Sequence, residues 1–374
     1  MAHPGFFLAV EAAGTGAHPA SWRRADSRAE DMFTGRYWVD LIVAAEQAGL
    51  DAVFLPGSFG IRSGGPGGRL DAVAIAARVA AATHRIGLIP QAPVTHTEPF
   101  HLAKAIQSLD FATLGRAGWE VTVSEGGQQA RAFGRKPAQD AASLWHEADE
   151  AIEVVTRLWD SWEDDAEIRD APTGRFIDRD KLHYIDFTGD NFAVKGPSIT
   201  PRSPQGQPIV AVRADGAAAT EIALHRADLI RIGARDLDAA RARRTELRSA
   251  LAAVGRDPDS VHTLLDLDVH LADSVDGAAT ELRTLDSWAD PVAAAAPPAL
   301  RHLGTTETLR ELLTAVDSAE AADGVVLRPL ALPAVVRLLP ALDRKPQSSG
   351  TLRDRLGLAR PASRYATSTE GTPS

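Results

Sequence analysis

The stretch that most constrains the fold is residues 208–230, PIVAVRADGAAATEIALHRADLI. An apolar, β-branched run at 209–212 meets the turn Ala214-Asp215-Gly216, a helical run follows, and a second strand-like run opens at Ala227. Strand, tight turn, helix and next strand form the repeating unit of parallel α/β proteins. Because ligands of such folds gather at the carboxyl ends of the strands, we expect Asp215 and Gly216 to lie where chemistry takes place.

Similar units follow one another along the chain without an internal sequence repeat. Strands are predicted at 6–9, 52–55, 86–89, 117–124, 209–212, 229–232, 264–271 and 324–327. Amphipathic helices are predicted between them, with apolar residues spaced by three and four. Eight such units in 374 residues predict a (β/α)8 barrel, the TIM barrel, rather than an open sheet.

The composition of the chain shifts after a long helix that carries Trp145, Trp159 and Trp162. Residues 163–204 are charged, irregular and too long for an ordinary connection, so we predict an insertion that lies over the strand ends. A short Ala/Pro-rich linker is predicted at 291–300. The chain therefore divides into one barrel domain, 1–360, and a disordered tail, 361–374.

Charge and composition argue against several classes of function. With 40 Lys and Arg against 50 Asp and Glu, the net charge is -10, which argues against nucleic acid and anionic membranes as partners. The absence of cysteine excludes disulfides and thiolate chemistry and fits a reducing compartment. No apolar run reaches the ~18 residues of a membrane span, and the start of the sequence lacks the pattern of a signal peptide. We expect a cytoplasmic protein.

Loops after the second and third strands carry polar candidates. The glycine-rich loop at 57–68 lacks the order of a phosphate-binding P-loop, and a mobile surface loop is the better interpretation. His96 and Glu98 stand two apart after the third strand, but no third ligand accompanies them. We therefore interpret them as polar pocket or capping groups and predict no metal site.

Two strands place charged residues on one face. Glu120, Thr122 and Ser124 alternate with Trp119, Val121 and Val123, and Asp266 and Asp268 alternate with apolar neighbours. We expect these polar side chains, together with Arg213 and the further candidate Arg231, to point into the barrel. Because an unpaired buried charge is costly, Glu120 and Arg213, on adjacent strands, are expected to pair.

Several segments resemble the flavin-dependent monooxygenases of the bacterial luciferase-like superfamily, specifically the group of nitrilotriacetate monooxygenase, pristinamycin synthase and dibenzothiophene sulfone monooxygenase. The matching stretches include GTGAHPASWR, YWVDLIVAAEQAGLDAVFL, RAFGR, LWDSWEDDA, PRSPQGQP and TLRDRLGLAR. They run from the first loop to Leu358 and so cover nearly the whole chain. The order of LWDSWEDD and PRSPQGQP is the most specific feature of the resemblance.

The resemblance implies a TIM barrel with an insertion, reduced FMN supplied by a separate flavin reductase, activation of O2, and oxidation of a small organic substrate. It also implies a homo-oligomer, because relatives associate as dimers or tetramers. His18 and His96 are the implied candidates for catalysis near the oxygen or the substrate. The FMN-contacting positions implied by the family pattern are Ser58, Gln91, Thr95, Glu120, Ser124, Trp145, Asp215 and Gly216.

Some of these positions depart from the family pattern. Where relatives place an Asp after the second strand, this chain has Gly57 followed by Ser58, and a Gly-Ser-Ser turn is replaced by Ala214-Asp215-Gly216. Asp215 would repel a phosphate unless it turns away as a helix N-cap. We also expect an ionic network to occupy part of the space that the flavin ring fills in relatives.

Three hypotheses remain open at this point. The first is a working FMN-dependent, two-component monooxygenase. The second is a barrel that has lost tight flavin binding and serves as a partner subunit or binds another ligand. The third is a different flavin, such as the deazaflavin cofactor used elsewhere in the superfamily.

Overall fold

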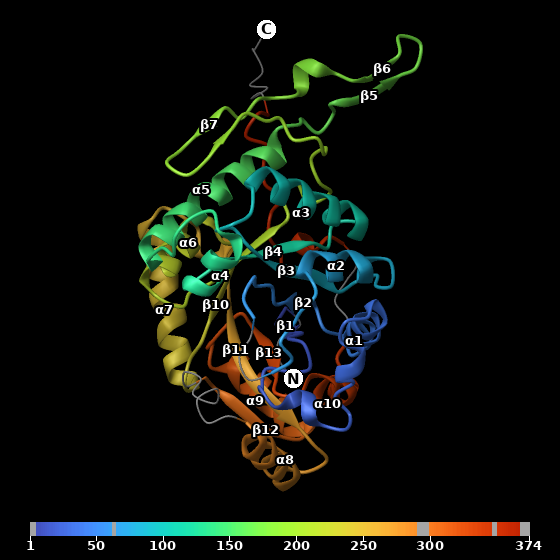
Figure 1. Ribbon diagram of the computed structural model, residues 1–374, viewed down its shortest axis with the longest axis vertical. Helices are drawn as coiled ribbons and strands as arrows, with labels where there is room; N and C mark the ends of the chain where they lie inside the picture. The colour runs from blue at the N-terminus through green and yellow to red at the C-terminus, as the bar shows by residue number, and fades with distance from the viewer. Residues whose placement is uncertain (1–4, 62–64, 290–298, 346–349, 367–374) are drawn as a thin grey trace.

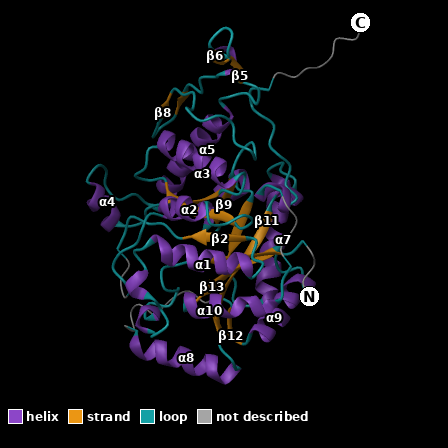
Figure 2. Cartoon of the chain, turned by 90° about the vertical axis from the view of Figure 1, so that its right-hand side faces the viewer, coloured by secondary structure: helices purple, strands orange, loops and turns teal. Residues whose placement is uncertain are grey.

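The computed structural model describes residues 5–61, 65–289, 299–345 and 350–366, which form a closed barrel of eight parallel strands wrapped by helices (Figures 1 and 2). The predicted (β/α)8 fold is confirmed. In the order in which they pair, the barrel strands are β1 (Phe7–Glu11), β2 (Ala52–Leu55), β3 (Gly87–Pro93), β4 (Gly118–Thr122), β9 (Ile209–Arg213), β10 (Leu229–Ile232), β11 (His262–Leu271) and β13 (Gly324–Pro329). Pairing between β13 and β1 closes the ring.

Helices cover the outside of the barrel, and polar caps set where several of them begin. Asp71, Asp140, Asp236 and Ser274 each accept a hydrogen bond from a backbone N–H in the first turn of the helix that follows. The helices are α1 (Gly35–Gln47), α2 (Ala72–Ala80), α3 (Pro99–Thr113), α4 (Gly127–Phe133), α5 (Ala141–Asp160), α6 (Ala217–Arg226), α7 (Leu237–Ala253), α8 (Val275–Trp288), α9 (Thr306–Ser318), α10 (Leu332–Leu338) and α11 (Leu352–Arg355). None of the helices in the described part of the chain has the length and apolarity to span a bilayer.

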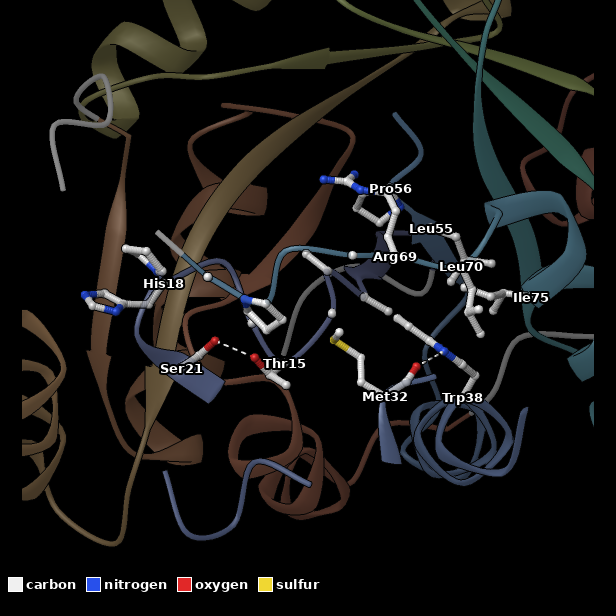
Figure 3. Close-up of a pocket in the computed structure, with 18 residues that line it drawn as sticks. Thr15, His18, Ser21, Met32, Trp38, Leu55, Pro56, Arg69, Leu70 and Ile75 are labelled. Atoms are coloured by element: carbon white, nitrogen blue, oxygen red, sulfur yellow. Dashed lines mark hydrogen bonds between the residues drawn. The ribbon is translucent and has the colours of Figure 1, made fainter. Parts of the chain in front are cut away.

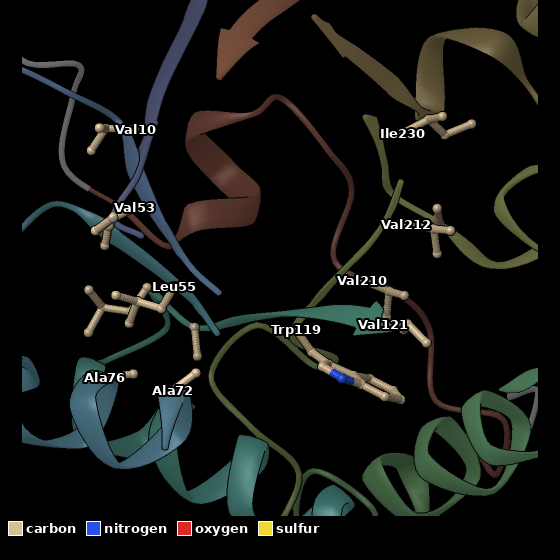
Figure 4. Packing of buried hydrophobic residues seen from close by; sticks show 14 of the residues in the cluster. Val10, Val53, Leu55, Ala72, Ala76, Trp119, Val121, Val210, Val212 and Ile230 are labelled. Atoms are coloured by element: carbon tan, nitrogen blue, oxygen red, sulfur yellow. The ribbon is translucent and has the colours of Figure 1, made fainter. Parts of the chain in front are cut away.

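The outward faces of the strands form the main core with the helices. Trp119, Val121, Val210 and Val212 all belong to this buried cluster (Figure 4). The indole of Trp119 meets that of Trp159 on α5 edge to face, with ring centroids 6.2 Å apart. Strand alternation therefore sends every second residue outward, as the sequence pattern predicted for 117–124.

Inside the barrel, the amino half is apolar and the carboxyl half is charged. Phe7, Phe54 and Ile89 belong to an internal apolar cluster that is closed from below by Leu352 and Leu356. Nearer the carboxyl ends of the barrel strands, the inward positions are Glu11, Gln91, Glu120, Arg231 and Asp266. The apolar floor places the polar residues at the end of the barrel where the strands point, which is where α/β barrels carry their sites.

A ninth strand and a short helix are among the elements that were not predicted. A ninth strand, β12 (Arg301–Gly304), pairs in parallel with the last residues of β11. Helix α4 follows β4 as a separate seven-residue helix before α5. Both are short, and β12 lacks a clear alternation of apolar and polar residues, so neither leaves a strong periodic signal. Most of the predicted linker, 291–298, lies outside the described residues.

The insertion folds into two small hairpins, β5 (Glu167–Asp170) with β6 (Arg175–Ile177) and β7 (Phe187–Thr188) with β8 (Ala193–Val194). The prediction that it lies over the strand ends is wrong, because its contacts follow the outer side of α5 (Figure 1). The Arg157 guanidinium lies 5.5 Å from the centre of the Phe187 ring, and Glu150 accepts a hydrogen bond from the backbone of Asp190.

The chain also continues along α5 near its C-terminus. Residues 361–366, which we assigned to the tail, are part of the described structure. Arg364 Nη1 donates to Glu153 Oε1 at 2.7 Å, and the Tyr365 ring stacks on His183 at 4.5 Å between centroids. Residues 367–374 of the predicted tail lie outside the described residues.

Candidate active site

A cluster of buried charges, here called the central network, lies across the carboxyl half of the barrel. Its centre is Arg231 on β10, which is fully buried. The Arg231 guanidinium contacts three carboxylates, with Nη1 at 3.0 Å from Glu120 Oε1 and Nη2 at 2.7 Å from Glu11 Oε2 and 2.8 Å from Asp266 Oδ1. It also lies 4.7 Å from the centre of the Phe54 ring. The predicted ionic network is therefore present.

The partner of Glu120 is not the one that we predicted. Glu120 is in register with Ala211, two residues before Arg213 on β9, so Arg213 sits one inward step closer to the mouth. Its Nε forms ion pairs with Asp266 Oδ2 at 3.0 Å and Asp215 Oδ2 at 2.9 Å. The prediction of a Glu120–Arg213 pair is wrong, because Arg213 turns to Asp266 and Asp215. Arg231, in register with Arg213 on β10, contacts Glu120 instead.

The carboxylates of the central network differ in their affinity for a proton. Burial acts against ionisation of Glu11, but Arg231 and Arg328 outweigh it and lower its pKa to about 2. Burial raises the pKa of Glu120 and of Asp266, and Arg231 offsets this only in part. A proton taken up by the network therefore goes to Glu120 or Asp266 before Glu11.

Glu11 and Arg328 are members of the central network that the sequence analysis missed. Arg328 on β13 contacts Asp268 Oδ1 at 3.2 Å and Glu11 Oε1 at 3.5 Å. Both residues end an apolar strand run, and a charge at the last inward position of a strand was the available signal.

The end of β2 is built around a glycine. Gly57 N–H donates to Gln91 Oε1 at 3.1 Å, and Gln91 Nε2 donates to Glu120 Oε2 at 2.7 Å. A Cβ at Gly57 would lie 2.2 Å from the backbone oxygen of Gln91, so no Asp fits here without a shift of the main chain. The departure from the family pattern at this position is therefore part of the backbone geometry, and Gln91 is turned toward the central network.

The ends of β3 and β4 hold polar atoms without partners. Thr95 Oγ1 accepts a hydrogen bond from Ser124 N–H at 2.9 Å. The Ser124 and Thr122 hydroxyl oxygens and both ring nitrogens of His96 are buried and make no hydrogen bond. Because buried polar groups are normally paired, this group of atoms indicates a place for a polar ligand.

The imidazole of His96 is stacked rather than hydrogen-bonded. Its ring lies on that of Phe133 at 4.5 Å between centroids and 17° between planes. Burial lowers the pKa of His96, and the nearby charge of Lys136 adds to this effect. His96 is therefore neutral near pH 7, with one nitrogen able to donate and the other to accept.

His18 is engaged on both sides of its ring. Nδ1 accepts from the Ala20 N–H at 3.1 Å, and Nε2 lies 3.1 Å from Asp286 Oδ1 on α8. With Nδ1 accepting, Nε2 carries the proton and donates to Asp286. His18 thus ties the first loop to α8, and its catalytic role stays a prediction.

A small cavity lies beside the barrel mouth, between the first loop and the ends of β1 and β2 (Figure 3). Met32, Trp38 and Ile75 line it, and the hydroxyls of Thr15 and Ser21 hydrogen-bond to each other at 2.8 Å. Its volume is about 60 Å³, which is room for a few water molecules at roughly 10–15 Å³ each. The cavity suits a small group and is too small for a flavin ring.

Asp215 does not cap α6. The N-cap is Gly216, with φ 128° and no side-chain cap, and the space where a Cβ would stand is open. The Asp215 carboxylate is instead paired with Arg213 and is more than half exposed. Of the two alternatives for Asp215, the structure therefore contradicts the N-cap, because Arg213, two residues earlier, offers the carboxylate a full charge.

Trp145 and Ser58, two other predicted cofactor positions, already have partners within the protein. The Trp145 side chain, on α5, is buried in the main core. Ser58 Oγ accepts from the Gly60 N–H at 3.1 Å. Among the predicted positions, Thr95 and Ser124 lie together beside His96, whereas Asp215 and Gly216 lie at the start of α6.

The polar residues on β3 and β4 fit FMN, whereas Asp215 at the start of α6 opposes its phosphate. Unpaired hydroxyls and His96 on β3 and β4 suit the polar groups of a flavin. The open amino end of α6 and Arg213 suit a phosphate, but the phosphate must displace Asp215 from Arg213. A phosphate at the amino end of α6 would therefore be held less firmly than in a Gly-Ser-Ser turn.

Comparison with known families gives one long match. The sequence model of the family described as luciferase-like monooxygenase matches residues 6–335. The chain is 33% identical over 287 residues to N-acetyl-S-(2-succino)cysteine monooxygenase of Bacillus subtilis, covering 76% of this chain and 65% of that protein. It is 29% identical over 292 residues to nitrilotriacetate monooxygenase component A of Aminobacter aminovorans, covering 74% and 64%. The matches thus span slightly less than two thirds of these relatives' own length.

Solved structures match almost throughout. Riboflavin lyase with modified FMN and riboflavin superposes with a TM-score of 0.85 at 23% identity, covering 95% of this chain and 96% of that one. The EDTA monooxygenase of Chelativorans sp. BNC1 gives a TM-score of 0.83 at 21% identity, covering 95% and 99%. At these identities the superpositions establish the fold.

Proposed function

The chain belongs to the luciferase-like monooxygenase family, and from that premise we propose that it is an FMN-dependent, two-component monooxygenase. It would oxidise a small organic substrate with O2 and reduced flavin supplied by a separate reductase. The observation that carries this proposal is the group of unpaired buried polar atoms of His96, Thr122 and Ser124 at the barrel mouth. We further propose a cytoplasmic homo-oligomer.

The protein's part in the reaction is to bind, orient and exclude water. The hydroxyls of Thr122 and Ser124 and the ring of His96 would hold polar groups of the flavin, and Arg213 with the amino end of α6 would hold its phosphate. When bound, FMN supplies the activation of O2. Neutral His96 is able to donate from one ring nitrogen and to accept a proton at the other, which suits an oxygen-transfer site near pH 7.

The substrate would enter beside the first loop. The cavity there has apolar walls and two hydroxyls, Thr15 and Ser21, which suits an apolar group with one polar atom. Its position beside the ends of β1 and β2 places it next to the barrel mouth. We propose that this cavity takes the end of the substrate that is held fixed during oxidation.

Flavin binding tests the proposal directly. Purified protein is titrated with FMN in air and with reduced FMN without oxygen, and flavin fluorescence is followed. A Kd below ~10 μM for reduced FMN, a binding free energy of about 7 kcal/mol, supports the monooxygenase. Oxygen consumption with a flavin reductase then reports turnover against panels of small organic compounds.

A second function is favoured by the charges of the site. Glu11, Glu120 and Asp266 surround a single buried guanidinium, and Asp215 stands where a phosphate would bind. These features suit a barrel that no longer binds flavin and acts as a partner subunit or binds another ligand. Absence of binding to either form of FMN, with the fold intact by circular dichroism, would support this second function.

A further inference from the structure

Three side chains able to bind a metal ion lie together on the outside of the barrel. His146 and Glu150 stand one turn apart on α5, and Asp190 comes from the turn between β7 and β8, beside α5 (Figure 1). His146 Nε2 is 3.0 Å from Asp190 Oδ2 and 3.7 Å from Glu150 Oε1. All three ligand atoms lie within 4.8 Å of one another.

The spacing of these atoms suits a small divalent cation. Zinc binds nitrogen and carboxylate oxygen at roughly 2.0–2.2 Å in a tetrahedral arrangement, which places neighbouring ligand atoms about 3.3–3.5 Å apart. The distances from His146 to Asp190 and Glu150 lie on either side of that value. One imidazole and two carboxylates form a ligand set that suits zinc and its neighbours among the transition metals.

The site is held in place by the backbone around Glu150. This carboxylate, about 9% exposed, accepts hydrogen bonds from the N–H groups of Asp190 at 2.6 Å and Asn191 at 2.8 Å. A Cβ at Gly189 would lie 2.5 Å from Glu150 Oε1, so the turn folds closely around the carboxylate. Each carboxylate oxygen has a second lone pair, and backbone donors of this kind orient metal ligands.

The charge balance points the same way. Within the part of the chain that the structure describes, no Lys or Arg forms an ion pair with Glu150 or Asp190, and His146 is their only basic partner. A nearly buried carboxylate is stabilised when a cation stands beside it. A divalent ion would provide one.

We propose that His146, Glu150 and Asp190 bind a zinc-like divalent cation that fastens the β7–β8 hairpin to α5. The sequence analysis predicted no metal site because Asp190 stands 44 residues from His146, and only the fold brings them together. This site is separate from the barrel mouth, so the proposal does not depend on flavin binding.

The test is a calorimetric titration of the full chain with ZnCl2 after treatment with a chelator. We expect one equivalent of zinc to bind with a Kd on the order of 1 μM and the melting temperature to rise as the site fills. Cobalt should give visible absorption bands of a nitrogen- and oxygen-ligated tetrahedral ion. Glu150 is left unchanged, because it also holds the turn through its backbone hydrogen bonds.

Variants separate the site from adventitious binding. His146→Ala and Asp190→Asn change exposed side chains and should weaken zinc binding at least tenfold each, with the fold intact. The matched control is His225→Ala, because His225 pairs with Glu221 at 3.2 Å with the same helical spacing on α6 but belongs to no such three-ligand group in the described structure. Zinc binding that is absent, or that is lost equally in the control, would overturn the proposal.

Discussion

Arg231 is the residue on which the charge balance of the barrel interior depends. Its side chain is fully buried and contacts Glu11, Glu120 and Asp266 at 2.7–3.0 Å. Of these carboxylates, Glu120 and Asp266 already have a raised pKa because burial disfavours their charge. Arg231 is thus the cation that all three carboxylates share, and its loss would be costly because buried charges need a partner.

Removing the Arg231 guanidinium should lower the free energy of unfolding. Arg231→Met keeps much of the volume but removes the ion-pair partner of buried Glu120 and leaves Asp266 and Glu11 with only Arg213 and Arg328. We expect a loss of roughly 3–5 kcal/mol in the free energy of unfolding. Urea denaturation followed by circular dichroism measures it. Arg235→Met, at an exposed position next to Asp236, is the control and should change stability by less than ~0.5 kcal/mol. A loss below about 1 kcal/mol in Arg231→Met would contradict the central role of Arg231.

Asp215 sets how firmly a phosphate is held. Asp215→Ser frees Arg213 and removes a carboxylate from the amino end of α6. The Kd for FMN should therefore fall at least roughly fivefold. Fluorescence titration measures the change. Asp238→Ser, an exposed carboxylate on α7 paired with Arg241, removes the same charge elsewhere and should leave the Kd unchanged. An equal gain in both variants would show that only net charge matters.

His96 separates stability from ligand binding. His96→Phe keeps the stack on Phe133 but removes two buried nitrogens that have no partner, so the protein should be as stable or more stable by up to about 1 kcal/mol. If those nitrogens serve the flavin or substrate, FMN affinity should fall roughly threefold to tenfold or turnover should be lost. Unchanged affinity together with unchanged turnover would assign the site to other residues.

At the scale of elements, α5 joins the barrel to the segments that surround it. Glu153 on α5 contacts Arg226 of α6, Arg157 of its own helix and Arg364 near the C-terminus. Glu150 holds the β7–β8 turn from the same helix. Segments distant in sequence are therefore anchored on one helix by a few carboxylates.

Glu153 should make stability depend on pH. Burial opposes its ionisation, but Arg364 and Arg157 outweigh it and lower the pKa to about 2. Because the folded pKa lies below the unfolded value of 4.5, the stabilisation is complete above pH 4.5 and is lost as the pH falls toward 2. Because its Arg partners are partly exposed and solvent screens these pairs, Glu153→Gln should cost roughly 1–2 kcal/mol at pH 7 and flatten the stability profile over that range. Parallel profiles for variant and parent in denaturation series from pH 7 to 2 would contradict this assignment.

At the scale of the whole molecule, the barrel is closed at its amino end by the last helix. Leu352 of α11 is fully buried and belongs to the internal cluster that includes Phe54 and Ile89. This apolar floor keeps water from the charged layer above it, where ion pairs depend on a low dielectric. Closure of the barrel at its amino end thus strengthens the ion pairs in its carboxyl half.

Leu352→Ala tests this closure. The cavity left beneath the barrel should lower the free energy of unfolding by roughly 2–5 kcal/mol. Leu114→Ala, at a position 82% exposed, is the matched control and should have little effect. The two variants are compared by urea denaturation, and similar losses in both would show that α11 does not seal the core.

The sequence by itself determined the barrel strands and, at 117–124, which side chains point inward and which point outward. Apolar runs of four to eight residues, separated by helical periodicity, predicted all eight barrel strands, because burial on both faces leaves a local pattern. Alternation at 117–124 placed Glu120 and Ser124 inward and Trp119 outward, as the structure confirms. The family resemblance implied the fold and the expected cofactor. The family match over residues 6–335 supports the resemblance, and the cofactor stays a proposal.

Only the tertiary structure decided which charges meet. Arg213 pairs with Asp266 and Asp215, and Arg231, in register with it on β10, contacts Glu120. Asp215 found Arg213 instead of the end of α6, and Asp190 came beside His146 from 44 residues away. Such pairings depend on distances between segments that are remote in sequence, which no local periodicity encodes. They also depend on the conformations of long side chains, which only the folded structure fixes.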